Sequence, residues 1–446
     1  MGWHDLSNEI KHEIIKWLPR DELKRIRLVC RALSDLATGT LFNLLRVHPS
    51  MSCMRRLQQI GLRPRLARCV QTLECQSLGL REDIIDRDDH FDQVMSFAEL
   101  ERPWPWSSVD FHQLSDLEVN RITARLHSSY LEEVAAQREL TELDIVSILS
   151  KTLAPFTHVH SLIWVNGDSL SPGEESDSDG IISISWDHPW CLSTGASQLD
   201  KKPFFGFLDV CMSLTRHPIT TLTTDFFWTS MQGGRDGLFA FGSLLDSVRK
   251  LSLLVDICDT DPCDQPTLDE FTSMLQRARR LHDLKLAVSG PKSTGCINST
   301  WSAILRSRFP NLERLTLKNV CATEDEVLEF LRAHRGTLTV LNFDGCNLFP
   351  APGYTQDRST TFQSSRTLKL LWKLRDTVNL SDLSLPNSIM DETWFIYSGI
   401  DASPERLLRR LEDYVCHRSQ RIHFEAFNES SEEQFDQALS SRKTDP

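Results

Sequence analysis

One segment has the glycine spacing of a phosphate-binding loop. Gly290 and Gly295 stand five residues apart, as in loops whose backbone N–H groups cradle phosphate. The next residues are Cys296 and Ile297, so the Lys and the Ser or Thr that would hold phosphate and magnesium are missing. We therefore expect no nucleotide site here.

A second segment imitates a calcium loop. Asp259, Asp261 and Glu270 have the acidic spacing of such loops, but the sixth position is Asp264, where the loop needs glycine for its sharp turn. Pro262 further stiffens the segment. We expect no calcium site.

The remaining side chains that could ligate a metal are also poorly spaced. His158 and His160 lie two residues apart without a neighbouring Cys or carboxylate cluster, so we interpret them as surface residues. Cys258 and Cys263 do not form a zinc spacing with a second pair. The hydrolase, metalloprotease and dinucleotide-binding motifs are absent as well. We expect no metal, no cofactor and no catalytic role, although distant residues can build an active site without a local motif.

Composition narrows the class of protein. The net charge of −13 argues against nucleic-acid binding, and no run of about 18 apolar residues is present that could span a membrane. Gly2 could suggest lipidation, but Leu6 stands where the modification motif needs Ser or Thr. The 12 cysteines include no CxxC pair, which favours a reducing compartment. We expect a cytoplasmic or nuclear protein, or one found in both places.

Charge is unevenly placed along the chain. Residues 11–70 contain 13 Lys or Arg and 4 Asp or Glu, a local excess of +9, which leaves −22 for the remainder. Such asymmetry is typical of segments with separate partners. The alternative is a small helical module with a solvated basic face.

The elements that would carry a function begin at the N-terminus. Apolar residues at helical spacing predict three short helices, over 8–18, 22–30 and 33–45. Asn8 and Asp21 are the expected caps, and Pro19 ends the first helix. Three helices this short cannot bury all their Leu and Ile among themselves. Part of the apolar surface is therefore expected to face a partner.

These helices contain four ordered runs of residues: Leu6-Ser7-Asn8-Glu9-Ile10, Leu18-Pro19-Arg20-Asp21-Glu22-Leu23, Arg27-Leu28-Val29-Cys30-Arg31 and Leu33-Ser34-Asp35-Leu36-Ala37. Their order and spacing resemble an F-box, in the version found in many fungal proteins. One departure is Ser7, because the family has Pro at this position. Pro pre-sets the direction of the chain into the first helix, so Ser7 is expected to loosen the contact with a partner.

The resemblance implies docking to the Skp adaptor, which links an F-box to a cullin scaffold and a ubiquitin-conjugating enzyme. The residues carried over as adaptor-binding candidates are Leu6, Ile10, Ile14, Leu18, Leu23, Leu28, Val29 and Cys30. For any one of them, a place in the internal core is an equal alternative.

Behind these helices a pattern recurs: apolar, two residues, apolar, one residue, apolar. It is clearest in copies that start at Val248, Leu281, Leu312, Leu338 and Leu380, and weaker in copies that start at Val70, Val159 and Ile219. The last two apolar positions of each copy alternate as on a strand, so both point inward.

Helical patterns lie between these predicted strands. Thr267 or Asp269 is the expected cap of one helix and Ser299 that of another. Thr323 and Glu326 have the spacing of a capping box ahead of a third. Strands and helices that alternate at this interval predict an α/β fold with a parallel sheet.

The region resembles the leucine-rich repeats that commonly follow a fungal F-box. The resemblance implies an irregular solenoid, in which an Asn or Cys follows the strand. Residues close to such positions are Asn319, Cys321, Asn342 and Cys346. The expected organisation is an F-box over 1–45, a connecting helical segment over 46–68, a degenerate repeat domain over 69–428 with insertions near 76–128 and 166–203, and a polar tail over 429–446. Ser176 and Ser178 lie in an acidic part of the second insertion and are possible phosphorylation sites or simply solvated.

The function expected from both resemblances is that of a substrate-recognition subunit of an SCF-type ubiquitin ligase. The F-box would dock to the adaptor, and the repeat domain would present an unknown client protein. Candidate client-binding residues on the strand face are Lys285, Arg314, Lys318, Asn342 and Asp344. The alternatives are a scaffold that uses the F-box outside a ligase and, from a different class, a hydrolase or other enzyme.

Overall fold

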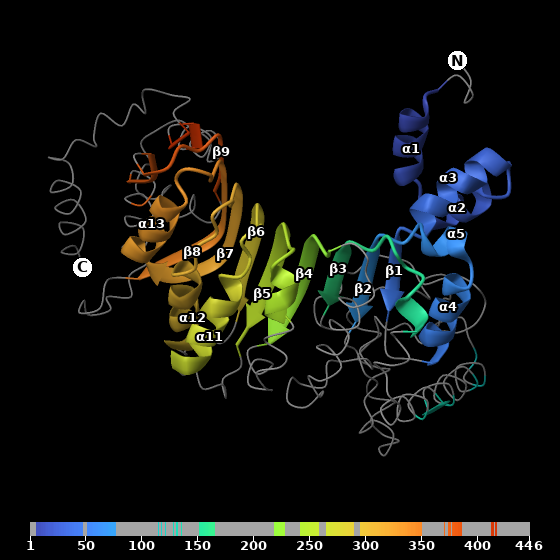
Figure 1. The fold of residues 1–446 in the computed structure, drawn as a ribbon, viewed down its shortest axis with the longest axis horizontal. Helices are drawn as coiled ribbons and strands as arrows, with labels where there is room; N and C mark the ends of the chain where they lie inside the picture. The colour runs from blue at the N-terminus through green and yellow to red at the C-terminus, as the bar shows by residue number, and fades with distance from the viewer. Residues whose placement is uncertain are drawn as a thin grey trace, which may run out of the picture. The chain divides into compact units, whose positions relative to one another are not determined.

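The computed structural model describes residues 6–47, 51–76, 151–165, 218–227, 241–257, 265–289 and 295–349, with shorter stretches at 373–375 and 377–385 and isolated positions in 115–135, at 370 and in 412–416. The chain divides into two compact units, Met1–Asp256 and Ile257–Pro446. Figure 1 shows parallel strands in both units, and in the second unit these strands alternate with helices. The α/β fold class is thereby confirmed. No described helix is long and apolar enough to cross a bilayer.

Three short helices open the first unit: α1 Asn8–Lys16, α2 Arg20–Ile26 and α3 Arg31–Leu41. Their buried core consists of Ile15, Leu23 and Ala37. Partly buried side chains pack around it, namely Leu18, Ile26, Leu33, Leu36 and Leu41. The three predicted helices are confirmed, although each ends earlier than expected.

The caps of the first two helices differ from the expected ones. Ser7 caps α1 in place of Asn8, because its Oγ accepts the backbone N–H of Ile10 at 3.4 Å. Pro19 holds the N-cap position of α2. Asp21 lies in the first turn instead, where its charge interacts favourably with the helix dipole.

A strand that the sequence analysis did not foresee follows α3. β1 Leu44–Val47 buries Leu45 and Val47 on one side. Phe42, Leu45 and Val47 repeat the apolar spacing of the other copies. The prediction of helix through residue 45 was therefore wrong, because the alternating burial of a strand takes over at Leu44.

The predicted connecting segment 46–68 is only partly helical. Its first residues belong to β1, and its helices are α4 Met51–Gly61 and α5 Pro64–Ala67. The buried face of α4 consists of Cys53, Met54, Leu57 and Ile60. A helix with this spacing packs one apolar stripe against the core.

Among the described residues of the first unit, four strands follow β1: β2 Thr72–Gln76, β3 Ser161–Val165, β4 Thr221–Phe227 and β5 Lys250–Asp256. Neighbours pair in parallel from β1 through β5. The register aligns one row of buried leucines: Leu45, Leu73, Leu162, Leu222 and Leu251.

The second unit repeats the arrangement, in the order α11 Gln265–Leu275, β6 Asp283–Ser289, α12 Gly295–Leu305, β7 Arg314–Thr323, α13 Glu324–Ala333, β8 Val340–Phe349 and β9 Asp382–Ser384. The four strands that the structure describes in this unit also pair in parallel. A second row of buried leucines runs through Leu284, Leu315, Leu341 and Leu383.

A recurrent backbone contact accompanies this register. The carbonyl of Asn43 accepts the N–H groups of Gln71 and Thr72 at 2.9 and 3.0 Å. The same double contact is made by the carbonyls of Gln71, His160, Thr220, His282, Glu313 and Thr339. In every case the residue whose carbonyl accepts stands two positions before a leucine of the buried rows. Asn43 makes β1 a full member of this series.

All eight predicted copies form strands. Every apolar position of the pattern is buried except Trp164, which is half-buried. The sequence pattern therefore located eight of the nine described strands.

For two of the three helices between these strands, the predicted start was wrong. α11 begins at Gln265, ahead of Thr267 and Asp269, and α12 begins at Gly295, so Ser299 lies inside the helix. The third was right. Thr323 and Glu326 form the predicted capping box at the start of α13.

Asn319 has a left-handed backbone conformation, with φ 53°. Asn tolerates this region better than most residues, because its short polar side chain can bond locally. The indole Nε1 of Trp301 donates to the Asn319 carbonyl at 3.1 Å, which ties α12 to this point of β7.

The second insertion, the polar tail, Ser176 and Ser178 lie outside the described residues, as do nearly all of the first insertion and the calcium-like segment up to residue 264. Of the loop that imitates a phosphate site, only Gly295 is described, at the start of α12.

Candidate functional site

One face of α1 is apolar and exposed. Ile10, Ile14 and Trp17 stand at positions i, i+4 and i+7, so they share a helix face, and the exposed fraction of Trp17 is 85%. Ile15, on the other side of the helix, is fully buried in the three-helix core. α1 therefore shows one apolar face to its own core and a second to solvent.

A second group of exposed apolar side chains follows α2. The exposed fractions of Leu28 and Val29 are 87% and 69%, and Cys30 is exposed as a free thiol. Backbone bonds from Leu28 to Arg25 and from Val29 to Ile26 close a turn there. The turn aims both side chains at solvent, where large apolar groups are stable only at a cost.

The other adaptor-binding candidates lie deeper. Leu6 and Leu18 are half-buried. Leu23 is only 5% exposed and belongs to the core with Ile15 and Ala37. Leu23 supports the exposed surface from within, because it packs with Ile15 of α1 and Ala37 of α3, and its role in adaptor binding stays a prediction.

Trp17 is a residue that the sequence analysis left out of the adaptor-binding set. The family pattern that supplies the candidates does not include it. Its spacing from Ile10 and Ile14 was the available signal.

Ser7 maintains the entry into α1. Its φ of −65° is the angle that Pro would impose, so the chain direction expected of the family is preserved. Hydrogen bonds from the Ser7 hydroxyl and from the backbone N–H of Glu9 hold the pKa of the Glu9 carboxyl below its usual value. A carboxylate in the first turn favours the helix.

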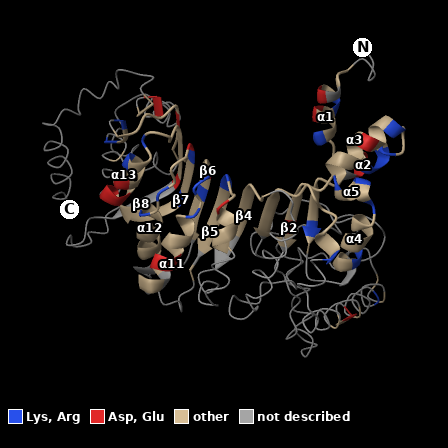
Figure 2. Cartoon of the chain, in the orientation of Figure 1, with Lys and Arg blue, Asp and Glu red and all other residues tan. Residues whose placement is uncertain are grey.

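Several charged side chains of α1 and α2 form ion pairs within their own helix. Lys16 pairs with Glu13 at 2.6 Å and Arg25 with Glu22 at 2.8 Å. Lys24 pairs with Asp21 at 3.2 Å. Farther along the chain, α4 and α5 contain Arg but no Lys, Asp or Glu, and Figure 2 draws their Arg residues in blue.

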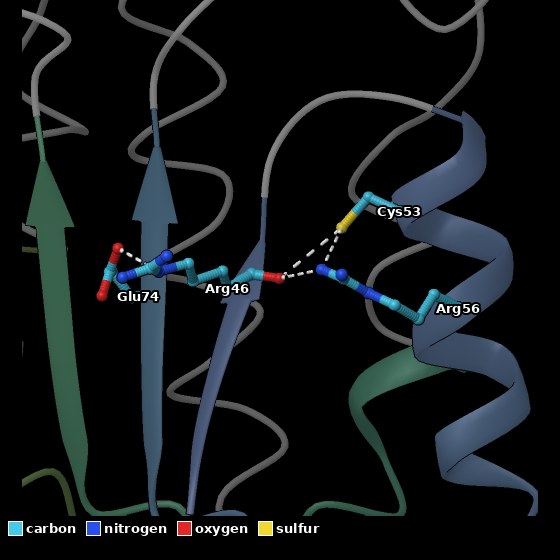
Figure 3. Close-up of polar contacts among 4 residues, drawn as sticks. All are labelled: Arg46, Cys53, Arg56 and Glu74. Atoms are coloured by element: carbon cyan, nitrogen blue, oxygen red, sulfur yellow. Dashed lines mark hydrogen bonds and ion pairs between the residues drawn. The ribbon is translucent and has the colours of Figure 1, made fainter. Parts of the chain in front are cut away.

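The first strand is tied to its neighbours by the contacts drawn in Figure 3. The Arg46 Nε donates to the Glu74 carboxylate at 3.1 Å, which links β1 to β2. The Arg46 carbonyl accepts from the Arg56 Nη2 at 2.9 Å, which links β1 to α4. The Cys53 thiol contacts the same carbonyl at 3.7 Å.

The five client-binding candidates lie on the strands of the second unit. They alternate with the buried leucines, so they share the opposite face. Register places Lys285, Thr316 and Asn342 in one row. The structure thus brings the candidates together, and their role in client binding stays a prediction.

Some of these side chains already have partners. Lys318 and Asp344 form an ion pair across β7 and β8. Asn342 Nδ2 donates to the Thr316 hydroxyl at 3.4 Å. Lys285 and Arg314 are exposed.

Within the described part of the chain, no group of three His, Cys, Asp or Glu side chains could hold a metal ion. His158 and His160 are both exposed, as expected for surface residues.

Comparison with known protein families identifies the helical module. The model of the F-box domain matches residues 3–45, which include all of α1, α2 and α3. The chain therefore contains an F-box domain, a class of module that typically binds the Skp adaptor. A search among curated proteins finds no match to this chain.

Proposed function

We propose that this protein is a substrate-recognition subunit of an SCF-type ubiquitin ligase. The observation that carries the proposal is the coincidence of the F-box match over 3–45 with exposed apolar side chains in the same residues, above all Trp17, Leu28 and Val29. Covering such side chains contributes roughly 25 cal/mol per Å² of apolar surface. A partner that covers them therefore has a strong driving force for binding.

The strand and helix units are the proposed client-binding region. Their parallel strands, regular leucine rows and recurrent backbone contacts support an assignment as degenerate leucine-rich repeats. In this assignment Lys285 and Arg314 are the polar candidates most open to a client. The strands hold these residues on a preformed face, which reduces the entropy cost of binding.

The mechanism that we propose is tethering. The F-box binds the adaptor, which is joined to a cullin scaffold. The repeat region holds the client near the conjugating enzyme that carries ubiquitin. Holding the two together raises the effective concentration of the acceptor lysine. This chain then needs no cofactor and no covalent chemistry of its own, and we place it in the cytoplasm or nucleus, where the ligase components are found.

Co-purification tests the adaptor assignment. The full chain is expected to recover a recombinant Skp adaptor, and the Leu28→Asp, Val29→Asp double variant is expected to lose it. These side chains are suited to the test because they are exposed, so the substitutions leave the three-helix core intact, unlike a charge at Leu23.

The matched control is Leu117→Asp, an exposed leucine outside the F-box match. Recovery of the adaptor by the double variant as efficiently as by the wild type would disprove the assignment of this surface.

A scaffold function outside a ligase is the second candidate, and Ser7 in place of Pro is the feature that favours it. The φ of Ser7 weakens this argument for a scaffold, because the chain enters α1 in the direction that Pro would give. If the wild-type chain fails to recover the adaptor, the scaffold function is the better one.

A further inference from the structure

A basic surface lies just outside the F-box match. Residues 46–73 contain six arginines and no Asp or Glu. Three of the six have partners: Arg46 with Glu74, Arg56 with the Arg46 carbonyl, and Arg65 with Asp35 at 3.0 Å. The other three carry their positive charge to solvent.

These three are Arg55, Arg63 and Arg68. All are exposed, and none has an ion pair or side-chain hydrogen bond among the described residues. Arg55 belongs to α4, and Arg63 and Arg68 stand at the two ends of α5, a short helix that contacts α4. Exposed guanidinium groups to which the described residues offer no counter-charge attract anions.

An apolar side chain accompanies this charge. Leu62, directly after α4, is 82% exposed. Arg55, Gln58, Gln59 and Leu62 are all exposed and stand at positions i, i+3, i+4 and i+7, so they continue one face of α4. We call the surface formed by Arg55, Leu62, Arg63 and Arg68 the arginine surface.

The arginine surface rests on a well-anchored support. The opposite face of α4 is buried through Met54 and Leu57, and Arg56 bonds α4 to β1. At the end of the helix, a Cβ on Gly61 would lie 3.3 Å from the Pro155 side chain, so the helix packs closely there. A preformed surface loses less entropy when it binds.

We propose that the arginine surface binds an acidic segment of a partner protein, with an apolar side chain of that segment packed on Leu62. Charge complementarity selects Asp and Glu, because Arg binds carboxylates through paired N–H donors. The exposed leucine and the chain's net charge of −13 favour a protein segment over a nucleic acid. The surface lies outside residues 3–45, so this proposal does not depend on the F-box binding its adaptor.

The test uses the full chain and fluorescence anisotropy with three labelled probes. These are a peptide rich in Asp and Glu with one central Leu, the same peptide with Asn and Gln in place of the acids, and a single-stranded DNA oligonucleotide of matched charge. The acidic peptide is expected to bind, more weakly as salt is added, and the amide peptide is not.

The variant that removes the charge is Arg55→Glu, Arg63→Glu, Arg68→Glu, and affinity for the acidic peptide is expected to fall by about tenfold or more. Its control makes the same charge change at three exposed arginines elsewhere, Arg249→Glu, Arg279→Glu, Arg280→Glu, and is expected to keep most of the affinity. Leu62→Ser is expected to weaken binding of the peptide that contains Leu more than that of a peptide with Ser in its place.

Three results would overturn the proposal: no binding of the acidic peptide by the wild type, equal losses in the two triple variants, or DNA that binds the same arginines more tightly than the peptide. The last result would assign the surface to nucleic acid. Adaptor recovery by the Arg55→Glu, Arg63→Glu, Arg68→Glu chain is measured in parallel, so failure of the arginine surface is distinguished from failure of the F-box.

Discussion

Arg46 on β1 and Glu74 on β2 form an ion pair at 3.1 Å in which the Glu74 side chain is 11% exposed. The two residues face each other directly in the parallel register. The pair therefore fastens the strand that follows the F-box to the rest of the first unit. A buried carboxylate depends strongly on its partner, because leaving either charge unpaired is costly.

We predict that Glu74→Gln lowers the free energy of unfolding by about 1–2 kcal/mol, because Arg46 loses its counter-charge and is itself half-buried. Urea unfolding followed by circular dichroism measures the change. Glu13→Gln is the matched control, since its pair with Lys16 is exposed and is expected to contribute less than about 0.5 kcal/mol. Equal losses in the two variants would contradict the structural role of the buried pair.

The capping box of α13 supplies a second stability prediction. Thr323 Oγ1 accepts the Glu326 N–H at 3.3 Å, and the Glu326 carboxylate accepts the Thr323 N–H at 2.9 Å. Thr323→Ala is expected to lower the free energy of unfolding by about 0.5–2 kcal/mol in urea unfolding. Ser273→Ala, at an exposed position within α11, is the control and is expected to have almost no effect.

Glu326 also connects two helices. Its carboxylate accepts from the Ser302 hydroxyl on α12 as well as from Thr323. Burial opposes ionisation, but these hydrogen bonds prevail and hold the pKa of Glu326 below its usual value. The loss in Thr323→Ala is therefore expected to shrink as the pH falls and Glu326 is protonated.

His334 makes the second unit sensitive to acid. The ring is buried, its Nδ1 lies 2.7 Å from the Phe330 carbonyl, and its Nε2 accepts the Phe309 N–H at 2.9 Å. This arrangement needs a neutral ring that donates from Nδ1. Burial chiefly, with a contribution from Arg308, lowers the pKa of His334.

The lowered pKa of His334 determines how the unfolding free energy changes with pH. The unfolded chain takes up the proton first, near pH 6.5, so the contribution of neutral His334 is complete above about pH 6.5 and is lost as the pH falls below it toward the folded pKa. We predict that unfolding free energy decreases over this window, by at most about 1.4 kcal/mol per pH unit from this one proton. His334→Gln is expected to remove that part of the slope, and His12→Gln, at an exposed position, is expected to retain it. Identical slopes in all three chains would show that His334 titrates normally.

Ser7→Pro tests the departure from the family pattern. The φ of −65° at Ser7 already fits Pro, so the backbone accepts the substitution, while the hydroxyl that caps Ile10 is lost. We predict a stability cost of about 1 kcal/mol at most and unchanged affinity for the adaptor, measured by calorimetry. Tighter adaptor binding by Ser7→Pro would instead show that Ser7 had loosened the contact.

The sequence located the strands well because their spacing is local. The central leucine of each copy, such as Leu284 or Leu315, is fixed by the alternation of burial within a few residues. β1 was missed because Leu44 and Leu45 also fit the preceding helix, and only pairing with Leu73, 28 residues away, decides for a strand. The predictions of helix caps at Asn8 and Ser299 were wrong because a polar side chain is suited to a cap at any nearby position.

The candidate site was less predictable for a different reason. Leu23 and Leu28 have the same residue type and lie close together in the chain, one within α2 and the other just after it, yet Leu23 is in the core and Leu28 in solvent. Helical spacing shows that both are apolar positions but does not show which face meets α1 and α3. That choice is made by the packing of three helices, which no single-helix pattern contains.

Trp17 gives the sharpest test of the face that α1 shows to solvent. Because 85% of the side chain is exposed, Trp17→Ala removes little from the core, so circular dichroism and the urea midpoint are expected to stay unchanged. If the adaptor covers α1, a buried Trp is the kind of residue that dominates an interface, and affinity for the recombinant adaptor is expected to fall by about tenfold or more. Calorimetry measures the affinity. Because the chain has 11 Trp residues, the burial of Trp17 is reported by the part of the fluorescence change on binding that the wild type shows and Trp17→Ala does not. Leu62→Ala, an exposed apolar side chain outside the F-box match, is the control and is expected to bind the adaptor as the wild type does. An unchanged affinity in Trp17→Ala would confine the adaptor surface to Leu28 and Val29, because the α1 face would then remain in water in the complex.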